Sequence, residues 1–402
     1  MKKGLITFLS LFALHLSAQD VIQWRGTDRT GIYKETGLMK SWPAEGPKML
    51  WHYANLGEGH SSVAIANDKI YATGLVDGSG HLFVFDMNGK LLNKKSYGQE
   101  WDRSYNGARG TMTINDGKLY VYSGTGNLVC FDESSLNIIW KKNIVDDFKG
   151  SNIQWGVNES PLIVDEKVII TSGGKVNNVV ALNKNTGELI WTCAGEGDTP
   201  AYCSPLYISE QQIPQIVTIT ANHVLGINAK TGEKLWSFAY NNMRNIHPNT
   251  PIYHDNMLLC VFGYGKGSVM LRLTDGGRKV EKVWENKEFD SKTGSAVKIG
   301  NYVYGSGDNN KYWFCLDWKT GEQKYKDRSI AVGAVIAAED MLYCYSDRGE
   351  MALVKATPEK FDMVSKFSIT LGTEQHWAHP VLHKGVMYVR HGNTLMAYAV
   401  KN

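Results

Sequence analysis

The chain has 402 residues, of which 43 are Lys or Arg and 40 are Asp or Glu, so its formal net charge is +3. Charged residues make up 21% and apolar residues 43% of the chain. This balance is ordinary for a globular protein and excludes disordered, collagen-like and coiled-coil chains. The near-neutral charge also argues against a nucleic-acid-binding protein, which would show a basic stripe.

Residues 1–18 have the pattern of a cleaved targeting segment. Two lysines precede a mostly apolar run over residues 5–16, and small residues offer a cleavage point near Ala18. The run is too short to span a bilayer, and no Cys follows the cut to carry a lipid anchor. The sequence therefore predicts a periplasmic or secreted protein without a membrane span.

One motif recurs along the chain at the length of a four-stranded propeller blade. Its copies are ALNKNTGELIW (181–191) and GINAKTGEKLW (226–236), with weaker ones in CFDESSLNIIW (130–140), RLTDGGRKVEKVW (272–284) and CLDWKTGEQKY (315–325). Apolar runs with the alternation of strands precede the copies, and no long helical periodicity follows residue 18. The pattern predicts an all-β chain built from repeated blades.

We count eight blades from their inner strands, which begin near Ser61, Thr111, Pro161, Pro205, Pro251, Ser295, Val335 and Pro380. Only three strands fit after the last of these positions, whereas KMLWHY (48–53) stands alone at the front with the pattern of an outer strand. We therefore expect a single eight-bladed β-propeller over residues 48–402, preceded by a leader of residues 19–47. Residues 48–53 would complete the eighth blade and hide two free sheet edges. We expect the ring to be a monomer.

The motif also has a mechanical interpretation. Asp or Asn with Thr-Gly forms a tight turn, because Gly accepts a positive φ without strain. The Trp then lies on the outermost strand and packs its large apolar area against the next blade. This blade-docking role is assigned to Trp51, Trp140, Trp191, Trp236 and Trp284.

Six cysteines are dispersed through the chain without a CxxC motif or an adjacent pair. A chain of this length buries a core without disulfides, so we expect buried free thiols. Cys193 and Cys203 are the first pair to check for a bond.

The repeat AxDxxTGxxxW resembles that of the pyrroloquinoline quinone (PQQ) enzymes, and the eight-fold count is similar to that of their propellers. Residues 24–51 resemble the leading segment of small exported PQQ-like repeat proteins, which are similar to the outer-membrane β-barrel assembly lipoprotein. The resemblance covers nearly the whole chain after residue 18 and implies the fold. Because the Trp motif is structural, it does not by itself imply the cofactor.

Several features of the PQQ dehydrogenases are missing. The chain lacks the adjacent-cysteine pair that lies beside the quinone in those enzymes, and it has no haem motif. Asn158-Glu159 stands where a calcium ligand would suit, without the rest of a ligand set. We expect no cofactor, with PQQ and calcium as the alternative. The resemblance to the assembly lipoprotein does not extend to its lipid anchor.

The loops before the inner strands of a propeller gather at one mouth of its channel, and in this sequence they are rich in His, Arg and aromatic residues. Those before blades 6 and 7 are small and bland. Imidazole and phenol groups transfer protons, so His60, His376 and Tyr105 are the catalytic candidates. The candidate ligand-binding residues are His60, Trp101, Arg103, Arg109, Trp155, His247, His376, Trp377 and His379.

These residue types suit an acidic or neutral oligosaccharide, since Arg binds carboxylates bidentately and rings stack on sugar faces. They also suit a structural role, in which His and Arg bond the backbone carbonyls of neighbouring blades. His376, His379 and His60 would offer three imidazoles to a metal, but two histidines three apart are a weak motif and no metal site is assigned.

The leading hypothesis is a non-enzymatic exported propeller that binds a ligand or a protein partner through one face of the ring. One alternative is a carbohydrate-active enzyme, a polysaccharide lyase that acts on an acidic glycan at the mouth. A second alternative is a small PQQ-dependent alcohol or sugar dehydrogenase.

Overall fold

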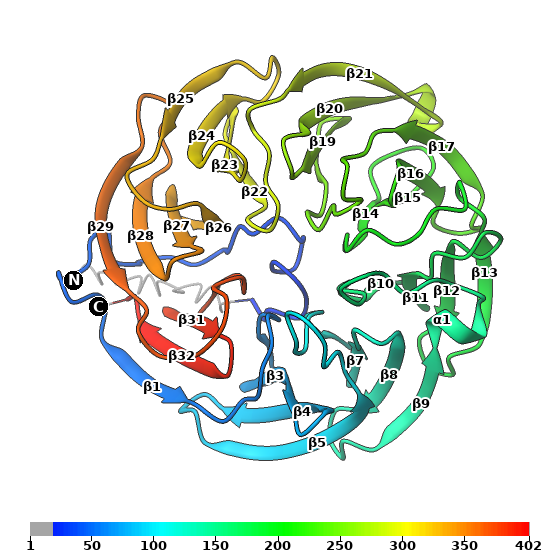
Figure 1. Ribbon diagram of the computed structural model, residues 1–402, viewed down its shortest axis with the longest axis horizontal. Coiled ribbons are helices and arrows are strands. Elements are labelled where there is room, and N and C mark those ends of the chain that lie inside the picture. Colours follow the sequence, from blue (N-terminus) through cyan, green and yellow to red (C-terminus); the bar gives the residue numbers. More distant parts are fainter. Residues whose placement is uncertain (1–18, 402) are drawn as a thin grey trace, which may run out of the picture.

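The protein is a ring of eight antiparallel four-stranded sheets arranged around a central channel (Figure 1). The computed structural model describes residues 19–401, so the predicted targeting segment of residues 1–18 lies outside the described residues. The all-β prediction is confirmed: the described chain contains one short α-helix, α1 (Ile144–Asp147), and one 3-10 turn, η1 (Asp275–Gly277). Neither is long and apolar enough to cross a membrane.

Blades 1 to 4 each use four consecutive strands, with the first strand innermost. They are β2 (Ala64–Ala66), β3 (Lys69–Val76), β4 (Ser79–Asp86) and β5 (Leu91–Gln99); β6 (Thr113–Asn115), β7 (Lys118–Tyr122), β8 (Asn127–Asp132) and β9 (Ile138–Asn143); β10 (Leu162–Val164), β11 (Lys167–Thr171), β12 (Val179–Asn183) and β13 (Leu189–Cys193); β14 (Leu206–Ile208), β15 (Gln215–Ile219), β16 (His223–Asn228) and β17 (Lys234–Ala239).

Blades 5 to 7 repeat this order, and blade 8 combines the last three strands with the first. They are β18 (Ile252–His254), β19 (Met257–Phe262), β20 (Gly267–Thr274) and β21 (Lys279–Asn286); β22 (Ala296–Ile299), β23 (Tyr302–Gly307), β24 (Tyr312–Asp317) and β25 (Gln323–Asp327); β26 (Gly333–Ala338), β27 (Met341–Ser346), β28 (Glu350–Lys355) and β29 (Asp362–Ser368); β30 (Val381–His383), β31 (Val386–His391), β32 (Thr394–Ala399) and β1 (Met49–Tyr53).

The ring closes through the pairing of its two ends, as predicted. β1 is antiparallel to β32, with Tyr53 opposite Leu395 and Met49 opposite Tyr398. The predicted strand of residues 48–53 is therefore the outermost strand of blade 8. This pairing covers the edge that β32 would otherwise expose to other chains.

A tryptophan of one blade packs on the Thr-Gly turn of the next blade at several interfaces. Trp191 Nε1 donates to the carbonyl of Ala229, and a Cβ added to Gly232 would lie 2.7 Å from the Trp191 ring. The same arrangement joins Trp140 with Gly187 and Trp284 with Gly321, and Trp51 packs on Gly89, which follows Asn88 instead of Thr. The glycine thus provides both a positive φ and a surface without a side chain. Trp236 differs, because its Nε1 donates to Gln215 Oε1 of its own blade.

The leader of residues 19–47 crosses the centre of the ring (Figure 1). Arg25 and Arg29 are both 3% exposed there. Their guanidinium groups donate to carbonyl oxygens at the starts of inner strands: Ala296 and Val335 accept from Arg25, and Ser160, Pro161 and Pro205 accept from Arg29. Burial lowers the pKa of both arginines to about 10, so both stay charged at neutral pH.

The leader also supplies an aromatic side chain to blade 7, whose outer strand has no tryptophan. Trp42 packs on Phe367 and Tyr343, with ring centroids 5.5 and 5.8 Å away. Its backbone N–H donates to Ser365 Oγ at 3.0 Å. A segment without the blade repeat therefore completes the packing of one blade.

All six cysteines are buried free thiols. This agrees with the expectation from chain length, and Cys193 and Cys203 are not bonded to each other. The core of each blade interface rests on apolar packing instead of cross-links.

The contact between Trp191 and Gly232 should be measurable as stability. Gly232 has φ +77° and Gly78 has φ +75°, but nothing lies within 4 Å of a Cβ added to Gly78. We expect Gly78→Ala to cost about 1–2 kcal/mol, because both variants carry the left-handed strain. Gly232→Ala should cost about 1–3 kcal/mol more, since its methyl group meets the indole. Urea unfolding of both variants measures this difference, and equal losses would show that the indole contact is not tight.

Candidate ligand-binding site at one mouth of the ring

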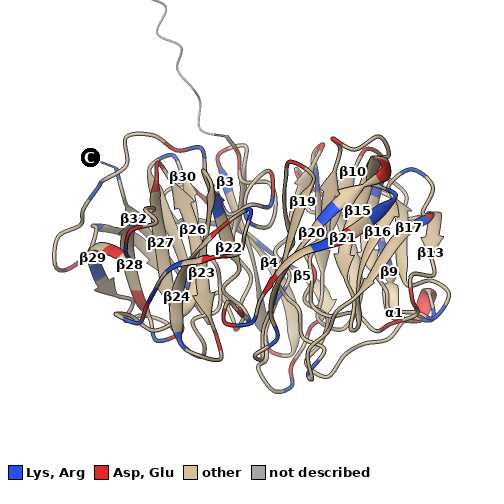
Figure 2. Ribbon diagram, turned by 90° about the horizontal axis from the view of Figure 1, so that it is seen from above, with Lys and Arg blue, Asp and Glu red and all other residues tan. Residues whose placement is uncertain are grey.

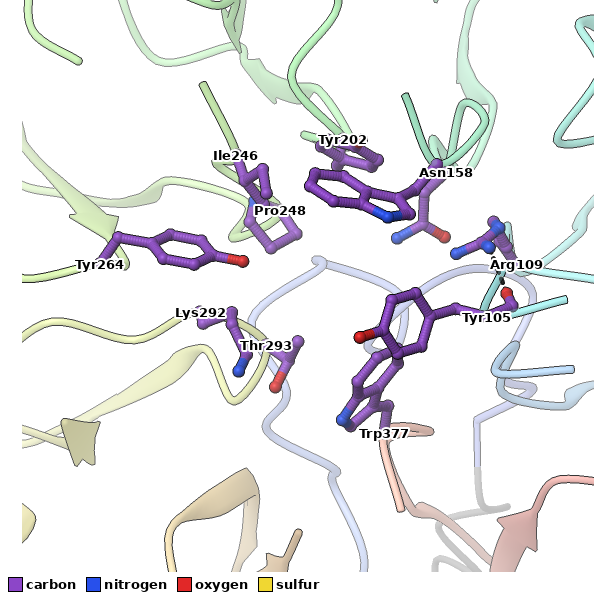
Figure 3. A pocket seen from close by; sticks show the side chains of 11 residues that line it. Tyr105, Arg109, Asn158, Tyr202, Ile246, Pro248, Tyr264, Lys292, Thr293 and Trp377 are labelled. Carbon is purple, nitrogen blue, oxygen red and sulfur yellow. Dashed lines mark hydrogen bonds between the residues drawn. The ribbon is translucent and has the colours of Figure 1, made fainter. Parts of the chain in front are cut away.

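The loops before the inner strands meet at one mouth and enclose a cavity of about 180 Å³, which we call the outer chamber (Figure 3). Blades 2 to 6 and blade 8 contribute to it, and aromatic rings dominate its walls. Its lining residues are Tyr105, Arg109, Trp155, Asn158, Tyr202, Ile246, Pro248, Tyr264, Lys292, Thr293 and Trp377.

A second cavity of about 70 Å³, the inner chamber, shares five lining residues with the outer one. It is lined by Trp24, His60, Arg109, Asn158, Ser160, Pro248, Thr293, Trp377 and His379. Trp24 belongs to the leader; its Nε1 donates to Thr250 Oγ1 at 3.2 Å, and its ring meets His379 edge-on with centroids 4.7 Å apart. The leader therefore contributes one wall of the inner chamber.

Arg109 lies where the two chambers join and is 9% exposed. One of its Nη atoms donates to the carbonyl of Tyr105, while its buried Nε has no partner among residues 19–401. The carboxylate of Glu100 acts on it electrostatically but accepts hydrogen bonds from Tyr97 and from the backbone of Trp101 instead. Arg109 is thus a buried cation that no carboxylate contacts directly.

His60 lines the inner chamber with both ring nitrogens buried and unpartnered within the described chain. Burial, followed by the charges of Arg109 and Arg390, lowers the pKa of His60 to about 3. The imidazole is therefore neutral at physiological pH and offers one N–H donor and one acceptor. Its ring packs against Trp377 at a centroid distance of 5.0 Å.

His379 connects the inner chamber to the leader. Arg25 Nη1 lies 2.9 Å from its Nδ1, and its Nε2 lies 2.8 Å from the carbonyl oxygen of Thr293. Because Arg25 can only donate, Nδ1 accepts and Nε2 carries the proton, which describes a neutral imidazole. Burial and the charge of Arg25 lower the pKa of His379 to about 3.

The structure brings five of the predicted ligand-binding residues into the chambers: His60, Arg109, Trp155, Trp377 and His379. Tyr105, a catalytic candidate, also lines the outer chamber, and its side chain is 46% exposed. The contact of any of these residues with a ligand stays a prediction.

The other four predicted residues, Trp101, Arg103, His247 and His376, lie outside the chambers. Trp101 is buried beneath the guanidinium groups of Arg103 and Arg109, at 5.3 and 5.8 Å from its ring centroid. The ring of Trp101 thus packs against the guanidinium group of Arg109. The Arg103 side chain is exposed to solvent. His376 Nδ1 lies 2.6 Å from the hydroxyl of Tyr345, and its ring stacks on His391 at 3.6 Å.

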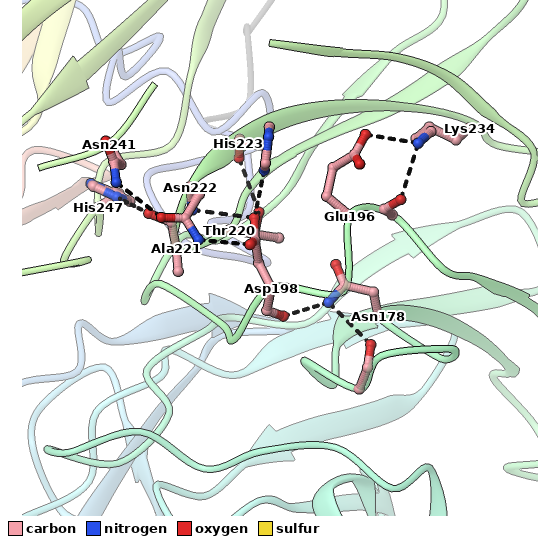
Figure 4. Close-up of polar contacts among 12 residues, drawn as sticks. Asn178, Glu196, Asp198, Thr220, Ala221, Asn222, His223, Lys234, Asn241 and His247 are labelled. Carbon is pink, nitrogen blue, oxygen red and sulfur yellow. Dashed lines mark hydrogen bonds and ion pairs between the residues drawn. The ribbon is translucent and has the colours of Figure 1, made fainter. Parts of the chain in front are cut away.

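His247 is fully buried and does not line either chamber. Its Nε2 lies 3.0 Å from the carbonyl oxygen of Ala221, and its Nδ1 faces Asn242 Nδ2 at 3.3 Å. Figure 4 shows it beside a network in which Asp198 accepts hydrogen bonds from Thr220, Asn222 and His223. Its position favours the structural role that the sequence left open.

Nine lining residues were not among the sequence candidates, and they include Trp24, Tyr202, Tyr264 and Lys292. Tyr264 lies in the hairpin between β19 and β20, and Lys292 lies in the loop before blade 6 that the sequence analysis described as bland. Trp24 is in the leader, whose path through the channel has no signal in the repeat. In the sequence, only the His, Arg and aromatic residues of the loops before the inner strands indicated which residues would line the mouth.

The described residues do not fit the calcium ion that accompanies PQQ. Neither chamber is lined by a carboxylate, and residues 19–401 contain no group of three His, Cys, Asp or Glu that could hold a metal ion. Both carboxyl oxygens of Glu159 face the backbone N–H of Thr171, at 3.0 and 3.2 Å. Burial raises the pKa of Glu159 to about 8, so at neutral pH it is a poor cation ligand.

A family model described as outer membrane protein assembly factor BamB matches residues 76–202 and 147–359. The chain belongs to this family. Its members are PQQ-like β-propellers, as the repeat indicated. Among curated proteins, no sequence matches the chain.

Solved structures share the fold at low identity. BamB from Moraxella catarrhalis is 13% identical, with a TM-score of 0.64 over 88% of this chain and 99% of its own. Quinohemoprotein alcohol dehydrogenase from Comamonas testosteroni is 11% identical, with a TM-score of 0.69 over 95% of this chain and 80% of its own. A europium-containing methanol dehydrogenase is also 11% identical, with a TM-score of 0.65 over 93% of this chain and 90% of its own. These likenesses establish the fold alone.

The burial of His379 beside Arg25 should make the fold sensitive to acid. An unfolded His titrates near 6.5, whereas His379 in the folded chain has a pKa of about 3. The unfolded state therefore binds more protons in this window, and stability falls as the pH drops below 6.5. The slope contributed by His379 is at most about 1.4 kcal/mol per pH unit.

Urea unfolding at pH 7 and pH 4.5 measures this loss. We expect His379→Gln to lose less stability between the two pH values than the unaltered protein does. His254→Gln is the matched control, because the His254 side chain is 51% exposed. An unchanged loss in His379→Gln would show that this histidine does not carry the acid sensitivity.

Proposed function

We propose that the protein is an exported binding module that holds a small ligand in the two connected chambers. One observation carries this proposal: Arg109 Nε and both ring nitrogens of His60 are buried at the inner chamber without a partner in residues 19–401. Buried polar groups in folded proteins are normally paired, and an unpaired one costs free energy. Because these atoms are shielded from solvent, the side chains would turn toward the inner chamber for a ligand to supply the missing partners.

The low basicity of the two chamber histidines favours binding over catalysis. A general base works best when its pKa lies near the working pH. The pKa of both His60 and His379 is about 3, so each is a weak base at neutral pH. The proposal therefore departs from a lyase that would use His60 or His379 as its proton acceptor.

Export is supported by the targeting pattern of residues 1–18 and by the family to which the chain belongs. On the side seen in Figure 2, Lys and Arg are interspersed with Asp and Glu without a stretch of one sign. This distribution favours a small ligand over a polyanionic nucleic acid.

A thermal-shift panel tests the proposal on the purified protein. It contains neutral oligosaccharides, acidic oligosaccharides, small organic acids, and PQQ with Ca²⁺. We expect one small-ligand class to raise the melting temperature, because a ligand at 100 times its Kd adds about 2.7 kcal/mol to the folded state. Tyr105→Ala should weaken that shift, since the ring lines the outer chamber.

Tyr253→Ala is the matched control, because that tyrosine lies away from both chambers. It should keep the full shift. The proposal is contradicted if no class shifts the melting temperature, if Tyr105→Ala keeps the full shift, or if the bound compound is turned over. Stabilisation only by PQQ with Ca²⁺ would favour the dehydrogenase alternative.

A further inference from the structure

We infer that the ligand is a carboxylate carried on a single six-membered ring. Its carboxylate would lie in the inner chamber against Arg109 and His60, and its ring would lie among the aromatic side chains of the outer chamber. The inference rests on the proposed function and names the chemical class of ligand that the same site takes.

The sizes of the chambers set the size of the ligand. The inner chamber holds about 70 Å³, and a water molecule takes about 30 Å³ of liquid, so a carboxylate fits there. The outer chamber holds about 180 Å³, and an engineered cavity of about 150 Å³ accepts benzene. One six-membered ring therefore fits the outer chamber.

The charge of the walls sets the charge of the ligand. Two cations and no carboxylate line the chambers. Lys292 Nζ lies 3.5 Å from Asp308 Oδ1 and so has a partner, but no carboxylate contacts Arg109 directly. A buried cation without a counterion is costly, and a carboxylate against a guanidinium relieves that cost with charge-assisted hydrogen bonds.

Neutral groups beside Arg109 complete a site for an acid. His60 offers an N–H donor from its unpartnered ring, and Ser160 and Thr293 bring hydroxyl groups to the same chamber. The side chain of Asn158 lines both chambers and offers an amide N–H donor. These donors stabilise a carboxylate without adding a second unpaired charge.

The outer chamber provides flat surfaces for the ring of the ligand. Figure 3 shows Tyr202 and Tyr264 on one side of the hollow and Tyr105 with Trp377 on the other. The centroids of Tyr105 and Trp377 are 5.3 Å apart, so the two rings form one continuous wall. Aromatic walls pack on the apolar faces of both aryl rings and sugar rings, so the shared chemistry is a ring-borne carboxylate.

Titration calorimetry with matched acids and neutral analogues tests the inference. The probes are D-galacturonate against D-galactose, and 4-hydroxybenzoate against 4-hydroxybenzamide, so that the two arms separate a sugar acid from an aryl acid. We expect at least one acid to bind about ten-fold or more tightly than its neutral analogue. Arg109→Met should abolish that preference, and Arg278→Met, which alters an exposed arginine, should keep it.

Circular dichroism of Arg109→Met checks that the ring is folded, and His60→Ala provides a second variant that should also reduce the preference. If a neutral analogue binds as tightly as its acid and Tyr105→Ala weakens both, the inference is wrong while the proposed function stands. If the acid preference survives Arg109→Met, or if PQQ binds more tightly than both single-ring acids, the inference is also wrong. If none of the probes and no member of the thermal-shift panel binds, both proposals fail.

Discussion

The structure depends on two guanidinium groups that hold the leader in the channel. Carbonyl oxygens at the starts of several inner strands accept hydrogen bonds from the leader. Arg25 and Arg29 donate to five of them, at the starts of blades 3, 4, 6 and 7. Arginine suits this position because its planar fork presents several donors at once and remains charged when buried.

The leader in the channel contributes to the set of groups that line the mouth. With Arg29 and Trp24 in place, the mouth leads into a closed pocket that has the leader as one wall. Neutral carbonyl oxygens accept the hydrogen bonds of the two buried arginines of the leader, and no carboxylate pairs with them directly among residues 19–401. Arg109 lies close to this region without a direct counterion, and His60 and His379 stay neutral beside buried arginines. A pocket of this kind favours anions and disfavours metal ions.

The repeat in the sequence predicts the ring because each copy encodes a complete local contact. Thr-Gly requires a turn, and the tryptophan of the preceding blade needs the bare surface of that glycine, as at Trp191 and Gly232. The closing strand was predictable for the same reason, since residues 48–53 carry an outer-strand pattern without a blade of their own. These features are local patterns of residues, so a single sequence is enough to recognise them.

The residues that line the two chambers were predicted only in part, because the direction of a loop depends on the curvature of the ring. Arg109, Trp155 and Trp377 were found from their place before inner strands, whereas Tyr264 reaches the pocket from a hairpin that has no such signal. The path of the leader was hidden for another reason: residues 19–47 lack periodicity, and their partners are distant backbone carbonyls. Composition alone also made His247 resemble a site residue, although its nitrogens lie against a backbone carbonyl and an amide group.

The most direct test of the account is a crystal structure of the protein grown with 4-hydroxybenzoate or D-galacturonate. The account predicts Arg25 and Arg29 in the channel, Trp24 at the wall of the inner chamber, and the carboxylate within hydrogen-bond distance of Arg109. A leader that lies outside the channel, or an acid bound away from Arg109, would contradict it.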